Sequence, residues 1–127
     1  MGRVYFISGH RDITQDEFDK YYLNIIDKLA EDKNNTFVVG DYHGVDIMAQ
    51  TELAFLVDPE RVTVYHMFDK PRNLASKKFK LKGGYKTDEE RDSAMTREST
   101  DDVAWIRKGK ETSGTAQNIL RRYTMFD

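Results

Sequence analysis

The sequence predicts an α/β domain, a small Rossmann-like fold of three layers with a mostly parallel sheet of four to five strands. The main observation is that short β-branched and aromatic runs alternate with amphipathic helical stretches along the whole chain. A second observation is that polar turns containing glycine follow three of these runs. The third is size, because 127 residues, 39% of them hydrophobic, suit one domain over residues 1–127.

The first strand and the first helix have clear local signals. Residues 3–8 are almost continuously apolar, which is typical of a buried strand. The run from Thr14 to Glu17 has the form of a capping box, in which each of these two side chains accepts a hydrogen bond from the other residue's backbone. Apolar residues then recur every three or four positions from Phe18 to Leu29, so we expect a helix with one buried face.

Two further strands follow, with a helix between them. Residues 36–39 are predicted to form a second buried strand, and residues 45–56 the helix after it. The dipeptide Asp58-Pro59 ends this helix, because the residue before a proline disfavours helical dihedral angles. Residues 61–66 are β-branched and aromatic, and they predict the third strand.

The last part of the chain is predicted to contain two helices and a strand. Residues 87–98 are predicted to form a helix that begins with a second capping box. Residues 102–106 predict a fourth strand, and residues 116–122 a final helix. Residues 123–126 are expected to add a short strand or to pack on the core.

Composition excludes several classes of function. Lys and Arg total 20 and Asp and Glu total 22, and this net charge of −2 excludes a uniformly basic nucleic-acid-binding protein. The absence of cysteine excludes disulfides, cysteine nucleophiles and zinc ribbons, and three scattered histidines predict no metal site. No apolar run approaches the roughly 18 residues of a membrane span. We expect no signal peptide, a cytoplasmic location and no cofactor.

The charge is unevenly distributed. Residues 70–86 carry seven cations and no acid, which leaves the rest of the chain with a charge of −9. We expect a loop with some helix here, either a solvated loop or a lid. The alternative is an anion-binding surface for nucleic acid, because Phe79 and Tyr85 lie among the lysines.

The turn after the first strand contains four candidate ligand-binding residues. In a parallel sheet, turns that lead from a strand to a helix meet at the carboxyl edge, where ligands bind. Gly9 allows close approach of the backbone, Arg11 supplies a cation, and His10 and Asp12 add further polar groups. The alternative is that Arg11 and Asp12 pair with each other on the surface.

The turn after the second strand contains two glycines and two acids. Gly40 and Gly44 are candidate ligand-binding residues, although the spacing is not that of a dinucleotide-binding loop. Asp41 is a candidate for gripping ribose hydroxyls. Asp46 falls in the first turn of the following helix, where it is either a functional acid or a complement to the helix dipole.

The turn before the last helix and one arginine complete the candidate site. Ser113, Gly114 and Thr115 offer hydroxyls and amides that suit phosphate, or else they only cap the helix. Arg91 lies on the helix before the fourth strand and faces either the ligand edge or solvent.

These segments resemble motifs of the YspA-like branch of the SLOG superfamily of Rossmann-like domains. Residues 38–49 (VVGDYHGVDIMA) are similar to its GGA-x-GAD-x-x-A turn, and residues 7–14 (ISGHRDIT) to its TGSRD-x-T opening. Residues 91–95 (RDSAM) with the later DDVA are similar to its RN-x-x-M … AD stretch. Residues 113–116 (SGTA) match its GT turn. The matches occur in the same order along the chain.

The resemblance implies a site for a nucleotide or a nucleotide-derived ligand. It also implies that Arg91 corresponds to an arginine of the related LOG phosphoribohydrolases, which release the base from nucleoside monophosphates. The catalytic glutamate of those enzymes corresponds to Asn118 here, and an amide cannot act as that carboxylate. Relatives in this superfamily often form homo-oligomers, so the resemblance implies a dimer.

Two functions follow as hypotheses. The first is a domain that senses or sequesters a nucleotide-type ligand without turning it over. The second is a nucleotide N-glycosidase or deoxyribosyltransferase, with Asp41, Asp46 and Arg91 as the catalytic candidates and Asp12 or Asp92 as other possible acids. Nucleic-acid binding through residues 70–86 is a third and less favoured hypothesis.

Overall fold

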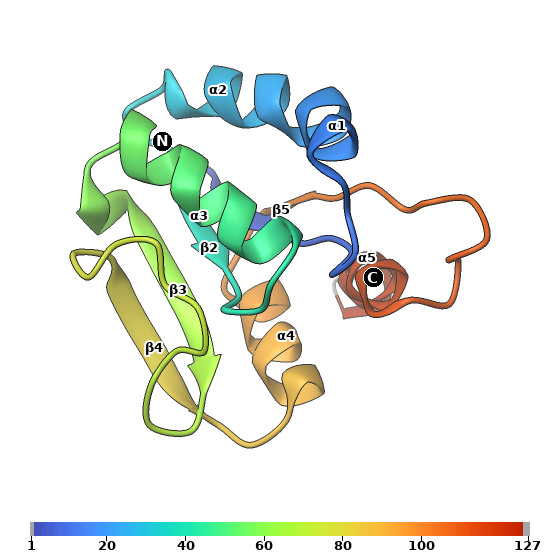
Figure 1. Cartoon of the computed structure of the whole chain (residues 1–127). Coiled ribbons are helices and arrows are strands. Elements are labelled where there is room, and N and C mark those ends of the chain that lie inside the picture. The colour runs from blue at the N-terminus through green and yellow to red at the C-terminus, as the bar shows by residue number, and fades with distance from the viewer. Residues whose placement is uncertain (1, 126–127) are drawn as a thin grey trace.

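The computed structural model describes residues 2–125 and confirms the α/β prediction (Figure 1). Five strands form one sheet in the order β4-β3-β2-β1-β5, and all neighbouring strands are parallel. The strands are β1 (Val4–Ile7), β2 (Thr36–Val39), β3 (Val62–Met67), β4 (Lys80–Tyr85) and β5 (Asp101–Val103). Because the strands are parallel, their carboxyl ends meet at one edge of the sheet.

Alternation along the strands gives the sheet two apolar faces. Ile7 of β1 lies beside Val39 of β2, and Val39 lies beside Val64 of β3, on one face. Phe6 and Val38 are also neighbours, and they lie on the opposite face with a separate group of buried side chains. Two apolar faces require helices on both sides, which explains the three-layer arrangement.

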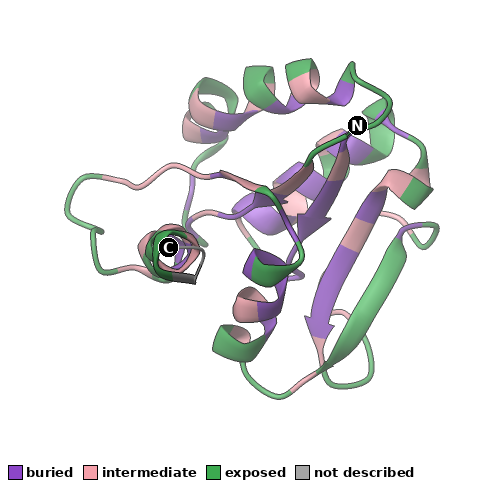
Figure 2. Ribbon diagram, turned by 180° about the vertical axis from the view of Figure 1, so that it is seen from behind, coloured by how far each residue is buried: buried purple, intermediate pink, exposed green. Residues whose placement is uncertain are grey.

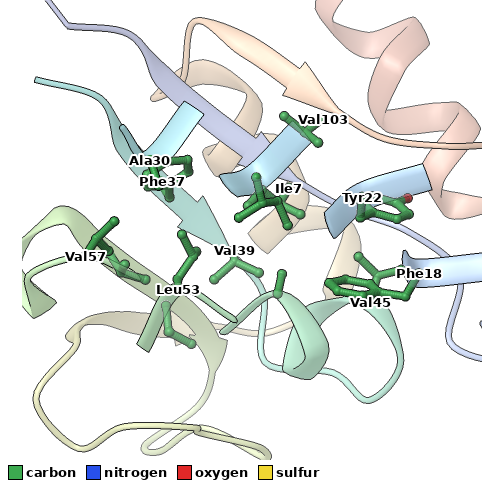
Figure 3. Close-up of a cluster of buried hydrophobic side chains, with 14 of the residues drawn as sticks. Ile7, Phe18, Tyr22, Ala30, Phe37, Val39, Val45, Leu53, Val57 and Val103 are labelled. Atoms are coloured by element: carbon green, nitrogen blue, oxygen red, sulfur yellow. The ribbon is translucent and has the colours of Figure 1, made fainter. Parts of the chain in front are cut away.

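The first face is covered by the helices of the first half of the chain. These helices are α1 (Gln15–Phe18), the π-helical turn η1 (Asp19–Leu23), α2 (Asn24–Ala30) and α3 (Val45–Leu56). The capping box predicted at Thr14 and Glu17 is present with both of its hydrogen bonds. Phe18, Tyr22 and Val45 pack over Ile7 in the main core, as Figure 3 shows.

The second face is covered by α4 (Asp88–Arg97), with α5 (Gly114–Met125) packed beside it (Figure 1). Ala94 and Met95 of α4 pack against Phe6 of β1. The N-cap of α4 is Thr87, and half of the predicted capping box is present: the Thr87 side chain accepts a hydrogen bond from the Glu90 amide, whereas the Glu90 carboxylate accepts from the Lys86 amide. Because β4 leads directly into α4, the N-terminal end of this helix lies at the carboxyl edge of the sheet.

The basic segment differs from its prediction. Its second half is not a loop or helix but the edge strand β4, which is exposed along most of its length and is green in Figure 2. Lysine and glycine are poor strand formers, and they are tolerated here because one edge of β4 has no neighbouring strand. The first half is a loop that is tied to the body of the domain through Arg72.

The end of the chain also differs in detail. Strand β5 begins at Asp101 and ends at Val103, so it is shorter than predicted. Tyr123 and Thr124 continue α5 and do not form a strand, whereas Phe126 lies outside the described residues. Within residues 2–125, no helix combines the length and the apolar character needed to cross a membrane.

Candidate functional site

A cavity of about 630 Å³ lies at the carboxyl edge of the sheet. Its walls come from the loops after β1, β2 and β5 and from the facing sides of α4 and α5. The predicted site residues that line it are Gly9, His10, Arg11, Asp12, Asp46, Arg91, Ser113, Gly114, Thr115 and Asn118. Four segments that are far apart in the sequence therefore form one site.

The topology explains why the cavity is at this place. β1 lies between β2 and β5, the chain leaves β1 toward helices on one face, and it leaves β5 toward α5 on the other face. Loops that diverge to opposite faces leave a crevice between them, which is the usual ligand site of open parallel sheets. Arg91 faces this crevice, which answers the question that helical spacing left open.

Asp46 lies in the first turn of α3 and is buried in the cavity wall. Its Oδ2 accepts a hydrogen bond of 3.1 Å from the Tyr42 amide. Burial raises the pKa of Asp46 to about 7, although the charge of Arg91 and the Tyr42 hydrogen bond act in the opposite direction. This carboxyl group is therefore able to hold or release a proton near neutral pH.

Arg91 is buried between carboxylates. Its Nη1 donates to Asp41 Oδ1 at 2.7 Å, and its Nη2 and Nε donate to Asp92 Oδ1 at 2.9 and 3.1 Å. Burial raises the pKa of Asp92, against the lowering effect of the Arg91 charge. We call Asp46, Arg91 and Asp92 the buried cluster, although the Asp92 side chain is 16% exposed. Because the guanidinium group of Arg91 already donates to Asp41 and Asp92, Arg91 is not a free cation for phosphate.

Asp41 does not line the cavity, contrary to a role in gripping ribose. Its side chain is fully buried and accepts hydrogen bonds from the Arg72 amide at 2.8 Å, from Arg72 Nη2 at 2.8 Å and from Arg91 Nη1. Asn73 Nδ2 donates to the Asp41 carbonyl at 3.0 Å. Asp41 thus anchors the start of the basic segment and orients Arg91.

Gly40 and Gly44 are also outside the cavity lining, and each is required for internal packing. A Cβ at Gly40 would collide with Asp46 Oδ2 and lie 3.0 Å from Arg91 Cζ, so glycine lets the buried cluster approach β2. Gly44 has a φ of 80°, and a Cβ there would lie 2.5 Å from the Arg11 carbonyl oxygen. These glycines shape the site without facing a ligand.

Three cations surround the cavity from three different segments. Arg11 follows β1, Lys110 follows β5, and Arg121 lies on α5. Within residues 2–125, none of these three rim cations forms an ion pair with an acid. Arg11 instead donates to the Tyr42 hydroxyl at 3.1 Å, and Arg121 donates to Asn118 Oδ1 at 2.6 Å. These three side chains are therefore available to an anion, although the same lining also contains acids, namely Asp12, Asp46, Asp88, Glu89 and Asp92.

The surface pairing of Arg11 with Asp12 does not occur. Asp12 instead accepts a hydrogen bond of 2.9 Å from Nη1 of Arg107, which lies 95 positions further along the chain. The capping alternative at α5 does occur, since Ser113 Oγ accepts from the Ala116 amide at 3.2 Å. The first amides of an α-helix have no intrahelical partner, so the N-terminal end of α5 adds to the positive character of the rim.

Sequence reasoning missed Lys110 and Arg121 in the cavity lining. Arg121 had a signal, because Thr115, Asn118 and Arg121 recur every three residues and share one face of α5. Lys110 had only its position in the long loop after a strand. No residue of the basic segment 70–86 contributes to the lining within the described part of the chain, so its cations do not border this cavity.

Among residues 2–125, no three His, Asp or Glu side chains are grouped so that they could hold a metal ion. Comparisons of the chain with protein-family models, with curated proteins and with solved structures find no match.

Proposed function

We propose that this domain binds a nucleotide or a nucleotide-derived ligand in the cavity at the carboxyl edge of its sheet. The observation that carries the proposal is the convergence of Arg11, Lys110 and Arg121, which form no ion pair within the described residues, on a cavity at the topological switch point. The ordered motifs similar to those of YspA-like SLOG domains support the same ligand class. The function is binding for sensing or sequestration, without turnover.

The distribution of charge indicates how such a ligand lies. A phosphate group is matched by the three rim cations, because none of them forms an ion pair within residues 2–125. The acids Asp88, Glu89 and Asp92 line the α4 side of the same cavity. The buried cluster offers carboxyl oxygens that accept hydrogen bonds, and these suit the hydroxyl groups of a ribose. Phe6 and Met95 also line the cavity, but each is only 1% exposed, so they offer little apolar surface to a base. The cavity volume of about 630 Å³ falls within the range of small-molecule sites.

Mass spectrometry of the ligand released on denaturation tests the proposal first. We expect a phosphorylated nucleoside derivative from purified protein, or a rise in melting temperature when nucleoside monophosphates are added. The variant Lys110→Gln should reduce this rise, because it removes a rim cation. Lys108→Gln is the matched control, since Lys108 is an exposed lysine of the same loop and does not line the cavity. Equal effects of the two substitutions would refute the assigned rim.

A second candidate function is hydrolysis of the N-glycosidic bond of a nucleotide. The observation that favours it is the presence of two carboxyl groups in the cavity wall, the buried Asp46 and the partly exposed Asp92. A carboxyl group with a pKa near 7 is suited to general acid catalysis, and an ionised carboxylate stabilises a cationic sugar centre. Release of free base from nucleoside monophosphates, lost in Asp46→Asn, would establish turnover and overturn the binding-only function.

Nucleic-acid binding through residues 70–86 stays a prediction. Two of its seven cations are held by acids, since Arg72 pairs with Asp41 and Asp88, and Lys82 pairs with Glu98. A salt-titrated binding assay with single-stranded DNA and RNA separates it from the cavity function. The homodimer also stays a prediction, and light scattering of the purified chain tests it.

A further inference from the structure

One wall of the cavity is formed by the long connection between β5 and α5. We call residues 104–113 the strap (orange to red in Figure 1). The strap carries Lys110 and Ser113 to the cavity, and it contains no helix or strand of its own. Its position therefore depends on side-chain contacts with the rest of the domain.

The first anchor of the strap is Trp105. Its ring stacks on Tyr21 with 4.1 Å between centroids and 6° between planes. Its amide donates to the Tyr22 hydroxyl at 2.8 Å, and that hydroxyl donates to the Ser8 carbonyl at 2.8 Å. Both tyrosines lie on the π-helical turn η1, and π-helical turns are often found at functional sites. This irregular turn thus presents two consecutive side chains to the strap.

The second anchor is Arg107. Its guanidinium group pairs with Asp12 at 2.9 Å and with Glu17 at 2.8 Å. Its backbone amide donates to Nε2 of His10 at 2.8 Å. His10 is buried and lies edge-on to Trp105, with 5.7 Å between the ring centroids. His10 therefore joins the loop after β1 to the strap, and both of these segments line the cavity.

The His10 hydrogen bond exists in only one protonation state of the ring. Nε2 accepts the Arg107 amide proton, so it carries no proton of its own and the ring is neutral. Burial lowers the pKa of His10, and the nearby charge of Arg107 lowers it further. Lys110 of the strap acts in the same direction, whereas Asp12 and Glu17 act in the opposite one.

Protonation of His10 would have two effects. It would convert the acceptor Nε2 into a donor that faces another donor, the Arg107 amide. It would also place a second cation beside the Arg107 side chain. Both effects disfavour the closed position of the strap.

We propose that neutral His10 latches the strap against the loop after β1 and that protonation of His10 releases it, together with the rim group Lys110. The consequence for ligand affinity rests on the proposed function, whereas the latch itself is a property of the protein without ligand. Acidification is then expected to open the wall of the cavity that contributes Lys110.

Amide hydrogen exchange of Arg107, measured by NMR on the protein without ligand, tests the latch. After correction for the intrinsic rate, we expect the protection of this amide to fall up to tenfold for each pH unit below about 6.5, until His10 is protonated in the closed state as well. In His10→Gln, the amide oxygen of glutamine accepts the same hydrogen bond and does not titrate. The protection in this variant should be independent of pH.

His43→Gln is the matched control, because His43 also lines the cavity but is exposed, and Arg107 donates its amide hydrogen bond to His10 and not to His43. It should keep the wild-type pH dependence. Should His10→Gln fail to fold, the NMR titration of the wild-type histidines replaces it, since the fall in Arg107 protection should stop at the pH at which His10 itself titrates in the folded protein. Protection unchanged between pH 7.5 and 5, or a fall in protection that persists in His10→Gln, would overturn the latch and would leave the proposed function untouched.

Discussion

Replacing Asp41 by asparagine should destabilise the protein strongly, although Asp41 does not line the cavity. The carboxylate is fully buried and is held between two arginines. Burial alone would raise the pKa of Asp41, but the hydrogen bonds from Arg72 and the charges of Arg72 and Arg91 outweigh burial and keep the pKa below its usual value. Its contribution to stability is therefore complete above pH of about 4 and is lost as the pH falls further.

The magnitude follows from the loss of one partner in a buried ion pair. Such a loss costs about 3–5 kcal/mol, because a buried charge is left without compensation. Asparagine keeps the shape and one acceptor oxygen, and Asp92 still pairs with Arg91, so we expect a cost near the lower end of this range. For a domain of this size, each kcal/mol lowers the melting temperature by about 4 °C. Asp41→Asn should therefore melt about 12 °C below the wild type.

Thermal unfolding followed by circular dichroism at pH 7 measures this cost. Asp12→Asn is the matched control, because Asp12 forms its ion pair with Arg107 at the surface, where its side chain is 70% exposed. Surface pairs contribute at most about 1 kcal/mol, so this control should melt within a few degrees of the wild type. An Asp41→Asn protein as stable as the Asp12→Asn protein would refute the anchoring role of Asp41.

Four other substitutions test the remaining electrostatic and packing arguments. Burial raises the pKa of Asp46 to about 7, so the free energy of unfolding of the wild type should fall between pH 4 and pH 7. Asp46→Asn should remove this fall and should be more stable than the wild type at pH 8, as measured by urea unfolding. Asp27 of α2 lies close to Glu52 and raises the pKa of Glu52 to about 7. Glu52→Gln should therefore also be more stable than the wild type at pH 8 but not at pH 4. Gly83→Ala should lower the free energy of unfolding by about 2–3 kcal/mol, because a Cβ at this position would overlap the His66 ring. Gly84→Ala should lower it by only about 1 kcal/mol of backbone strain, because a Cβ there meets open space.

The parts of the fold that sequence reasoning predicted have strong local signals. Strands β1 to β3 are apolar runs buried on both faces, and the first helix has a complete capping box. Strand β4 was missed because lysines and glycines at residues 80–84 do not look like a strand. Its formation depends on pairing with β3, which is a tertiary interaction that no local pattern reports.

The candidate site was predictable where it follows from topology. Polar turns after parallel strands must meet at one edge, so Gly9, Arg11 and Ser113 were expected to converge, and they do. The roles inside the site depend on long-range pairs. No sequence pattern near Asp41 indicates that Arg72 and Arg91 donate hydrogen bonds to its carboxylate. In the same way, no pattern near Arg107 indicates that it pairs with Asp12.

Calorimetric titration of the protein with the four common nucleoside monophosphates, and with the matching nucleosides, tests the central claim most directly. At least one monophosphate should bind, and its nucleoside should bind at least tenfold more weakly, because only the phosphate reaches the rim cations. In the triple variant Arg11→Gln, Lys110→Gln and Arg121→Gln, this difference should disappear. Failure of every monophosphate to bind, or equal affinity of the triple variant and the wild type, would contradict the assignment of this cavity as a nucleotide site.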